Sequence, residues 1–153
     1  MKNLEDNLKE VGGMELGRVL HRNLFFHLLD LEVKRARRYQ NFMCLLLVKL
    51  KNSPNGCAGS DFQTCYQLLS DLVTVELRES DILGSLGEDR LVALLPYADG
   101  SAGGLAKSRF ESVLKYFDFD KKGYEVAVEK ICFPINGADT IDLIKRALSE
   151  KAS

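Results

Sequence analysis

The sequence has almost no net charge, because 21 Lys and Arg residues balance 22 Asp and Glu residues and leave a formal charge of -1. A chain so close to neutrality has no overall positive field to attract nucleic acids or acidic membranes, although local basic patches remain. Its longest apolar run, residues 42–48, is far shorter than the about 20 residues that span a bilayer. We therefore expect no nucleic-acid partner and no membrane insertion.

Secretion signals and metal-binding cysteine patterns are also missing. The opening stretch, MKNLEDNLKEVGG, is charged and has no apolar centre, so no signal peptide is expected. The four cysteines, at positions 44, 57, 65 and 132, form no CxxC motif and no Cys/His spacing typical of zinc sites. We expect a cytoplasmic protein with free thiols, no metal and no bound cofactor.

The composition is that of an ordinary globular protein. Its 153 residues are 46% hydrophobic and 28% charged, which is enough chain and enough apolar content to bury one core. We predict a polar lead or linker over residues 1–13 and a single domain over residues 14–153.

The apolar periodicity predicts eight secondary-structure elements in the order α-β-α-β-β-α-β-α. Helices are predicted over residues 14–39 with a break near Arg22-Asn23, from a capping Ser60 to Leu77, over 100–117 and over 141–152; strands are predicted over 42–50, 82–86, 91–95 and 124–133. The buried side of the helix over 100–117 is predicted to carry Leu105, Ala106, Phe110, Val113, Leu114 and Phe117. The first strand is apolar almost throughout and should be central and covered on both faces. The fold class is therefore α+β, with a ferredoxin-like β-α-β-β-α-β core and a mainly antiparallel sheet.

The stretch from residue 76 to residue 96 organises this core. Two apolar runs flank a turn at residues 87–90, which is typical of a β-hairpin. Pro96 lacks the N–H group that a ladder needs, so the second run should end there. In the split arrangement the first strand lies beside the hairpin. We therefore expect the hairpin turn to lie next to Lys49 and Lys51 at the exit of the first strand, where any active site would be.

Three stretches carry a resemblance to a known family. They are RNLFFHLLDLEVKRARRY before the first strand, RESDILGSLGEDRLVALLP across the hairpin, and the closing VEKICFPINGADTIDLIKRAL. In this order and spacing, the chain from about residue 14 to residue 152 resembles a GGDEF domain, the module of bacterial diguanylate cyclases that condenses two GTP molecules into cyclic di-GMP.

The resemblance fails at the residues that would perform catalysis. In the family, two carboxylates on the first strand and one in the hairpin turn hold the metal ions that bridge the triphosphate. Here Lys49 and Lys51 occupy the two strand positions, and a lysine ammonium cannot bind Mg²⁺. The signature turn reads Gly87, Glu88, Asp89, Arg90, Leu91, in which only the first glycine and the aspartate match.

Two further stretches depart from the family. The loop after the first strand lacks the family's Phe-Lys-x-x-Asn-Asp stretch that reads guanine, and Val128-Glu129-Lys130 replaces the usual Ser-Ile-Gly. Together with the altered turn, these departures imply a degenerate domain that is not an enzyme and has no catalytic residues and no metal site.

One binding motif of the family remains. Arg78-Glu79-Ser80-Asp81 is an RxxD motif, and its place before Gly87 resembles the inhibitory product site of the family. The arginine fork can donate to O6 and N7 of guanine, while the carboxylate accepts from the guanine N–H edge. Ungapped counting places a third partner at Arg109. The same motif is alternatively a structural turn held by a local pair of Arg78 and Asp81.

Three functions follow as hypotheses. The leading one is an inactive signalling domain that binds cyclic di-GMP through Arg78, Asp81 and Arg109 and alters contacts with an unknown protein partner. The second is a ligand-free interaction or dimerisation module, with a homodimer as one form. An active diguanylate cyclase is the third, and Lys49 and Lys51 disfavour it.

Overall fold

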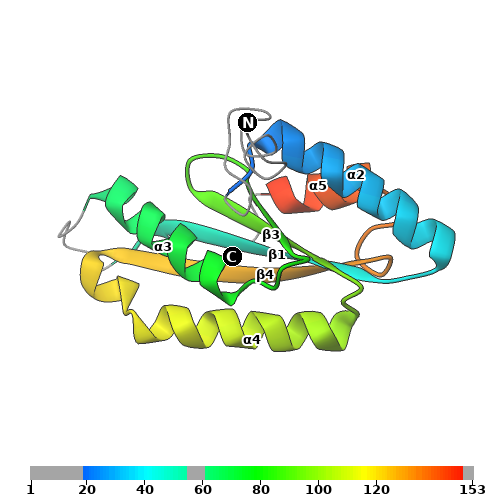
Figure 1. Ribbon diagram of the computed structural model, residues 1–153. Coiled ribbons are helices and arrows are strands. Elements are labelled where there is room, and N and C mark those ends of the chain that lie inside the picture. The colour runs from blue at the N-terminus through cyan, green and yellow to red at the C-terminus, as the bar shows by residue number, and fades with distance from the viewer. Residues whose placement is uncertain (1–18, 55–60, 150–153) are drawn as a thin grey trace, which may run out of the picture.

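A computed structural model describes residues 19–54 and 61–149 (Figure 1). Its elements are α2 (Arg22–Tyr39), β1 (Met43–Asn52), α3 (Phe62–Glu76), β2 (Ile82–Ser85), β3 (Arg90–Pro96), α4 (Gly100–Tyr116), the 3-10 helix η2 (Phe119–Lys122), β4 (Tyr124–Phe133) and α5 (Thr140–Leu148). The predicted order of helices and strands is confirmed, with η2 as an addition. The polar lead over residues 1–13, Cys57 and Ser60 lie outside the described residues. Within the described ranges, no helix is both long and apolar enough to cross a bilayer.

The four strands form one antiparallel sheet in the order β2-β3-β1-β4. This order confirms the ferredoxin-like core, because β1 lies beside the hairpin strand β3 on one side and β4 on the other. β2 and β4 are therefore the outer two of the four strands. β1 occupies a central position, as its continuous apolar run predicts.

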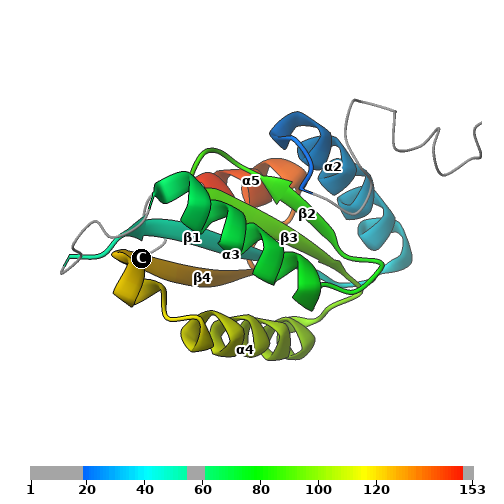
Figure 2. The same cartoon turned by 60° about the vertical axis from the view of Figure 1, so that its left-hand side comes forward.

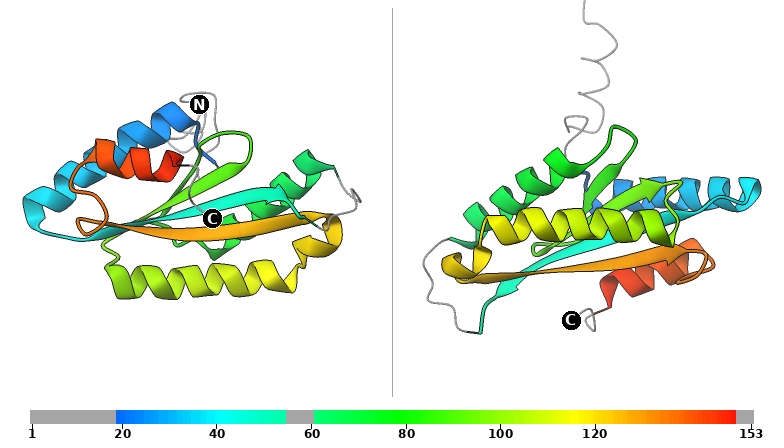
Figure 3. Two further views of the ribbon diagram at one scale, coloured as in Figure 1. Left: turned by 180° about the vertical axis from the view of Figure 1, so that it is seen from behind. Right: turned by 90° about the horizontal axis from the view of Figure 1, so that it is seen from below.

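Helices cover both faces of the sheet (Figures 1 and 2). Successive residues of β1 point to opposite faces. Leu46 and Val48 join a core beneath α3 and α4, whereas Leu45 and Leu47 join a second core beneath α2 and α5. Figure 3 shows the two helix layers from behind and from below. Because each face of the sheet is covered by its own core, both faces of β1 are apolar from Met43 to Val48, and the first polar side chain of the strand is Lys49.

The start of α2 differs from the prediction. His21 is the N-cap, and its imidazole accepts a hydrogen bond from the Asn23 N–H at 3.3 Å. Leu20 instead extends the sheet: its N–H donates to the Leu83 carbonyl at 2.8 Å, and its carbonyl accepts from Ser85 at 2.9 Å. The helix predicted over residues 14–39 is therefore wrong at residues 19–21, where Leu20 pairs with β2, and α2 begins at Arg22, near the predicted break.

Two other helix boundaries are corrected. Asp61, rather than Ser60, is the N-cap of α3, and its carboxylate accepts from the Thr64 N–H at 3.3 Å. α5 ends at Leu148 with Ser149 as its C-cap, so the helix predicted over 141–152 is wrong at Ser149, and residues 150–152 lie outside the described residues.

The buried face of α4 was also predicted incorrectly in part. Leu105 and Phe117 are 70% and 40% exposed. Ala106, Phe110 and Leu114 are buried as predicted, and Gly103 joins them in the buried stripe. Gly103 sets this phase, because an added Cβ would lie only 2.6 Å from the Cys44 sulfur on β1. The backbone of α4 thus approaches the sheet at its glycine, which turns Leu105 towards solvent.

Candidate functional site

The hairpin turn and the exit of β1 lie side by side, as the fold predicted. The Leu50 N–H donates to the Asp89 carbonyl at 2.9 Å, and Lys49 pairs directly with Arg90 across the sheet. β2 ends at Ser85, one residue earlier than predicted. The Ser85 hydroxyl donates to the Gly87 carbonyl at 2.8 Å, which turns the chain at that point.

Tyr66 of α3 supports this turn, and the sequence analysis missed it. Its phenolic oxygen lies 3.2 Å from the Arg90 carbonyl and 3.3 Å from the Ser85 hydroxyl. Burial raises the pKa of the Tyr66 phenol above its ordinary value. The only signal in the sequence is a tyrosine on the apolar face of a helix, where a buried hydroxyl needs a polar partner.

The positions at which the resemblance implied metal ligands carry cationic side chains. Directly opposite residues of an antiparallel pair share one face, so Lys49 and Arg90 project from the same side of the sheet. Lys51 forms an ion pair with Glu125, its neighbour on β4, at 3.7 Å. Among the residues that the structure describes, no three His, Cys, Asp or Glu side chains are close enough to hold a metal ion.

Arg90 has a second set of contacts, away from the turn. Its guanidinium lies 3.5 Å from the carbonyls of Ala147 and Ser149, at the C-terminal end of α5. A cation at this position satisfies carbonyls that have no partner within the helix and complements the helix dipole. The Arg90 side chain is only 12% exposed and also lies 3.8 Å from the Asp89 carboxylate. Arg90 therefore connects the hairpin turn to α5.

The RxxD motif is a closed turn between α3 and β2. The Asp81 carboxylate accepts from the Arg78 N–H at 2.8 Å, and the Asp81 N–H donates to the Arg78 carbonyl at 3.0 Å. The Arg78 guanidinium and the second carboxylate oxygen of Asp81 form no hydrogen bond or ion pair in the described part of the chain. The turn thus bonds the Arg78 backbone and one Asp81 oxygen, and leaves the Arg78 guanidinium and the other Asp81 oxygen available to a ligand.

Arg109 of α4 reaches the same end of α3. Its guanidinium donates to the Glu76 carbonyl at 3.2 Å and pairs with the Glu76 carboxylate at 3.3 Å. Glu76 precedes Arg78 by two residues. A cavity of about 490 Å³ beside the turn is lined by Arg78, Asp81 and apolar residues of α2, but Arg109 does not line it. The three predicted residues gather at one end of α3 without lining one cavity.

Solved structures share this fold. A DGC protein from Thermotoga maritima is 19% identical with a TM-score of 0.74, covering 90% of this chain and 97% of that one. The diguanylate cyclase SiaD from Pseudomonas aeruginosa, in complex with its activator SiaC, is 17% identical with a TM-score of 0.68, covering 94% of this chain and 58% of that one. A microbial GGDEF domain, described in its interaction with cyclic di-GMP, is 18% identical with a TM-score of 0.58, covering 84% and 80%.

Sequence comparisons find no relative, whereas structural comparisons do. No protein-family model matches the chain, and no curated protein is similar enough to match it. At identities below 20%, the structural neighbours establish the fold. The four-stranded antiparallel sheet, with its hairpin beside β1 and helices on both faces, gives this chain the fold of the GGDEF domains.

Proposed function

We propose that this chain is a catalytically inactive signalling domain that binds cyclic di-GMP through Arg78, Asp81 and Arg109. The observation that carries the proposal is that two polar groups of the RxxD turn are available to a ligand. The Arg78 guanidinium and one Asp81 oxygen have no partner in the described residues, and Arg109 reaches Glu76 close by. Cyclic di-GMP interacts with a microbial GGDEF domain of the same fold.

These groups suit the edges of guanine. Arg78 can donate two parallel hydrogen bonds to O6 and N7, and Asp81 can accept from the N–H edge. Arg109 would have to leave its ion pair with Glu76, which is partly exposed and therefore weak. The negative phosphates of the ligand also favour a turn that has two arginines near it.

The absence of catalysis is proposed from the charges at the hairpin. Phosphoryl transfer requires cations that neutralise the triphosphate, and these need carboxylate ligands. Lys49 and Arg90 occupy opposite positions there, and Arg90 is bound to the carbonyls of α5. Asp89 is the one carboxylate retained from the family's set of three. A metal ion would meet two positive side chains and one negative one.

Calorimetric titration of cyclic di-GMP tests the proposal. We expect micromolar binding to the unaltered protein, a loss of at least tenfold in affinity for Arg78→Ala, and little change for Arg38→Ala, an exposed arginine on α2. GTP with Mg²⁺ serves as the parallel ligand. No heat with cyclic di-GMP, or equal binding by both variants, would overturn the assignment of the site.

The alternative is a ligand-free interaction or dimerisation module. The turn bond between Arg78 and Asp81 and the ion pair of Arg109 are complete without any nucleotide. Large apolar side chains are also exposed on α3 and α4, with Val75 at 81% and Leu105 at 70%. Sedimentation analysis without nucleotide distinguishes the two, because a dimer that weakens in Leu105→Glu and ignores cyclic di-GMP supports this alternative.

A further inference from the structure

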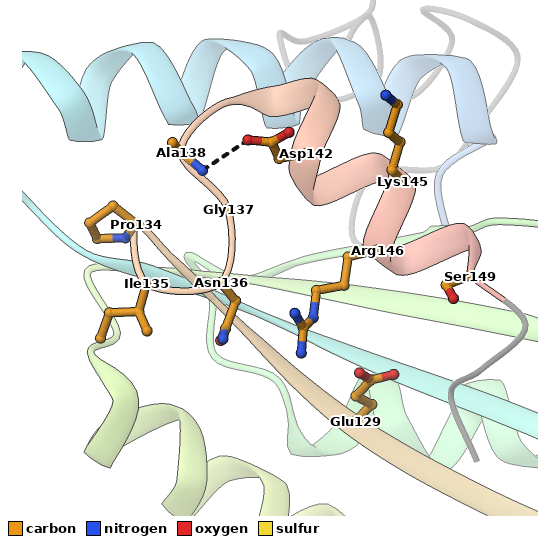
Figure 4. A pocket seen from close by; sticks show the side chains of 10 residues that line it. All are labelled: Glu129, Pro134, Ile135, Asn136, Gly137, Ala138, Asp142, Lys145, Arg146 and Ser149. Carbon is orange, nitrogen blue, oxygen red and sulfur yellow. Dashed lines mark hydrogen bonds between the residues drawn. The ribbon is translucent and has the colours of Figure 1, made fainter.

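Another cavity, with a polar lining, lies at the opposite side of the sheet from the RxxD turn. It has a volume of about 740 Å³, within the usual range for small-molecule sites. Its walls are Glu129 of β4, the loop of residues 134–138, and one side of α5 with Lys145 and Arg146 (Figure 4). Since β4 and β2 are the outer two of the four strands, this cavity is separate from the proposed cyclic di-GMP site.

Glu129 is an unusual residue for its position. It pairs with Leu47 and shares a sheet face with Ile131, so it lies at the border of the core beneath α2 and α5. Its Oε2 atom is buried and has no hydrogen-bond partner within the described residues. A buried carboxylate oxygen without a donor is unfavourable and rare in folded proteins. Position 129 is the one where the family's Ser-Ile-Gly stretch has its isoleucine.

The cavity also holds a cation without a partner. Figure 4 shows the Arg146 side chain pointing from α5 towards the Glu129 carboxylate, yet the two groups form no ion pair. The side chains of Lys145 and Arg146 make no hydrogen bond or ion pair with any part of the chain that the structure describes. The Lys145 ammonium points away from Glu129 (Figure 4), so one acceptor that lacks a donor and one guanidinium that lacks an acceptor face the same space.

Asn136 adds a donor of fixed orientation. Its Oδ1 atom accepts from the Cys132 N–H at 2.9 Å, and its own N–H donates to the Cys132 carbonyl at 2.7 Å. These two bonds hold the loop after β4 and leave the amide NH₂ group of Asn136 without a partner in the described ranges. The loop is held close to α5 as well, since a Cβ on Gly137 would lie 2.8 Å from Leu143.

We propose that this cavity binds a small anionic molecule that also carries N–H donors, with a nucleoside monophosphate such as GMP as its probe. Glu129 accepts from a pair of adjacent N–H groups, such as those of a guanine edge, after a small rotation about its soft terminal torsion. Arg146 binds the phosphate, and Asn136 donates to a ring or sugar oxygen. The ligand thereby supplies the partners that the side chains of Glu129, Arg146 and Asn136 lack.

The test is a calorimetric titration of GMP into the full chain and three variants. We expect Glu129→Leu and Arg146→Ala to lower the affinity for GMP at least tenfold, because each removes a hydrogen bond to a charged group. Lys115→Ala, on α4 at the other face of the sheet, is the matched control and should bind as the unaltered protein does. AMP, which has no N–H at the N1 position, should bind at least tenfold more weakly than GMP.

Three results would overturn the proposal. Equal binding of GMP, AMP and inorganic phosphate would mean a simple anion site without a role for Glu129. Loss of GMP binding in Arg78→Ala, with Arg146→Ala unaffected, would place the nucleotide at the RxxD turn instead. A fall in the melting temperature of ligand-free Glu129→Leu would show that the carboxylate is already satisfied in the fold, since removing an unpaired buried carboxylate should raise it. A failure of cyclic di-GMP to bind would leave this inference untouched.

Discussion

Replacement of Gly103 by alanine tests how α4 is positioned on the sheet. The new Cβ would lie 2.6 Å from the Cys44 Sγ and 3.1 Å from the Cys44 Cβ. Cys44 is fully buried in the central strand, so neither it nor the backbone of α4 can yield easily. Overpacking of this kind destabilises by about 1–3 kcal/mol, whereas the gain in helix propensity from glycine to alanine is about 1 kcal/mol. The net expectation is a loss of about 1 kcal/mol in the free energy of unfolding.

A double-mutant cycle isolates the contact. Cys44→Ala alone should cost about 1 kcal/mol through the lost sulfur. In the double variant the new methyl group enters the space that the sulfur leaves, so the two losses should not add, and the coupling energy should be about 1–2 kcal/mol. Urea denaturation of the four proteins measures it. A Gly103→Ala variant that is more stable by the full propensity gain would refute the close approach of α4 to β1.

Three further predictions concern the contacts between the elements. Arg90→Gln should lower the free energy of unfolding by about 1 kcal/mol in thermal melts, because it removes the cation from the end of α5. Burial raises the pKa of the Cys44 thiol and shields both Cys44 and Cys132 from reagents, so these two thiols should react with iodoacetamide only after unfolding, as mass spectrometry would show. Hydrogen bonds from Lys34 and from Thr140 of α5 lower the pKa of Asp30. This stabilisation is present above the unfolded pKa and is lost as the pH falls below about 4, so Asp30→Asn should flatten the acid limb of the stability profile.

Much of the fold follows from the sequence because local patterns and long-range packing agree. The apolar run of β1 predicts a central strand, and the Gly/Asp turn between two apolar runs predicts the hairpin. The boundaries that failed are those where a tertiary contact outweighs a local signal. Leu20 carries helical periodicity but pairs with β2, and Leu105 lies beside the buried stripe but is turned outward by the contact of Gly103.

The candidate site was less accessible to sequence reasoning. The pairing of Lys49 with Arg90 follows from the topology once the hairpin is placed beside β1. The contact of Arg90 with the end of α5 does not follow from the topology. It joins Arg90 to Ala147 and Ser149, which lie 57 and 59 positions later in the sequence, and it depends on the conformation of the Arg90 side chain. The hydrogen bond from the Arg78 N–H to the Asp81 carboxylate likewise depends on the backbone conformation of the turn, which the RxxD motif alone does not determine. Cyclic di-GMP binding and the loss of catalysis remain predictions.

The most direct test of the central claim is a ¹H–¹⁵N correlation spectrum of the labelled protein during a titration with cyclic di-GMP. The account predicts saturable shifts of the backbone amides over residues 76–82 and around Arg109, with none at the hairpin turn over residues 87–90. The same titration of Arg78→Ala should leave the spectrum unchanged. An unaltered spectrum of the original protein at millimolar nucleotide, or shifts confined to the hairpin turn, would contradict it.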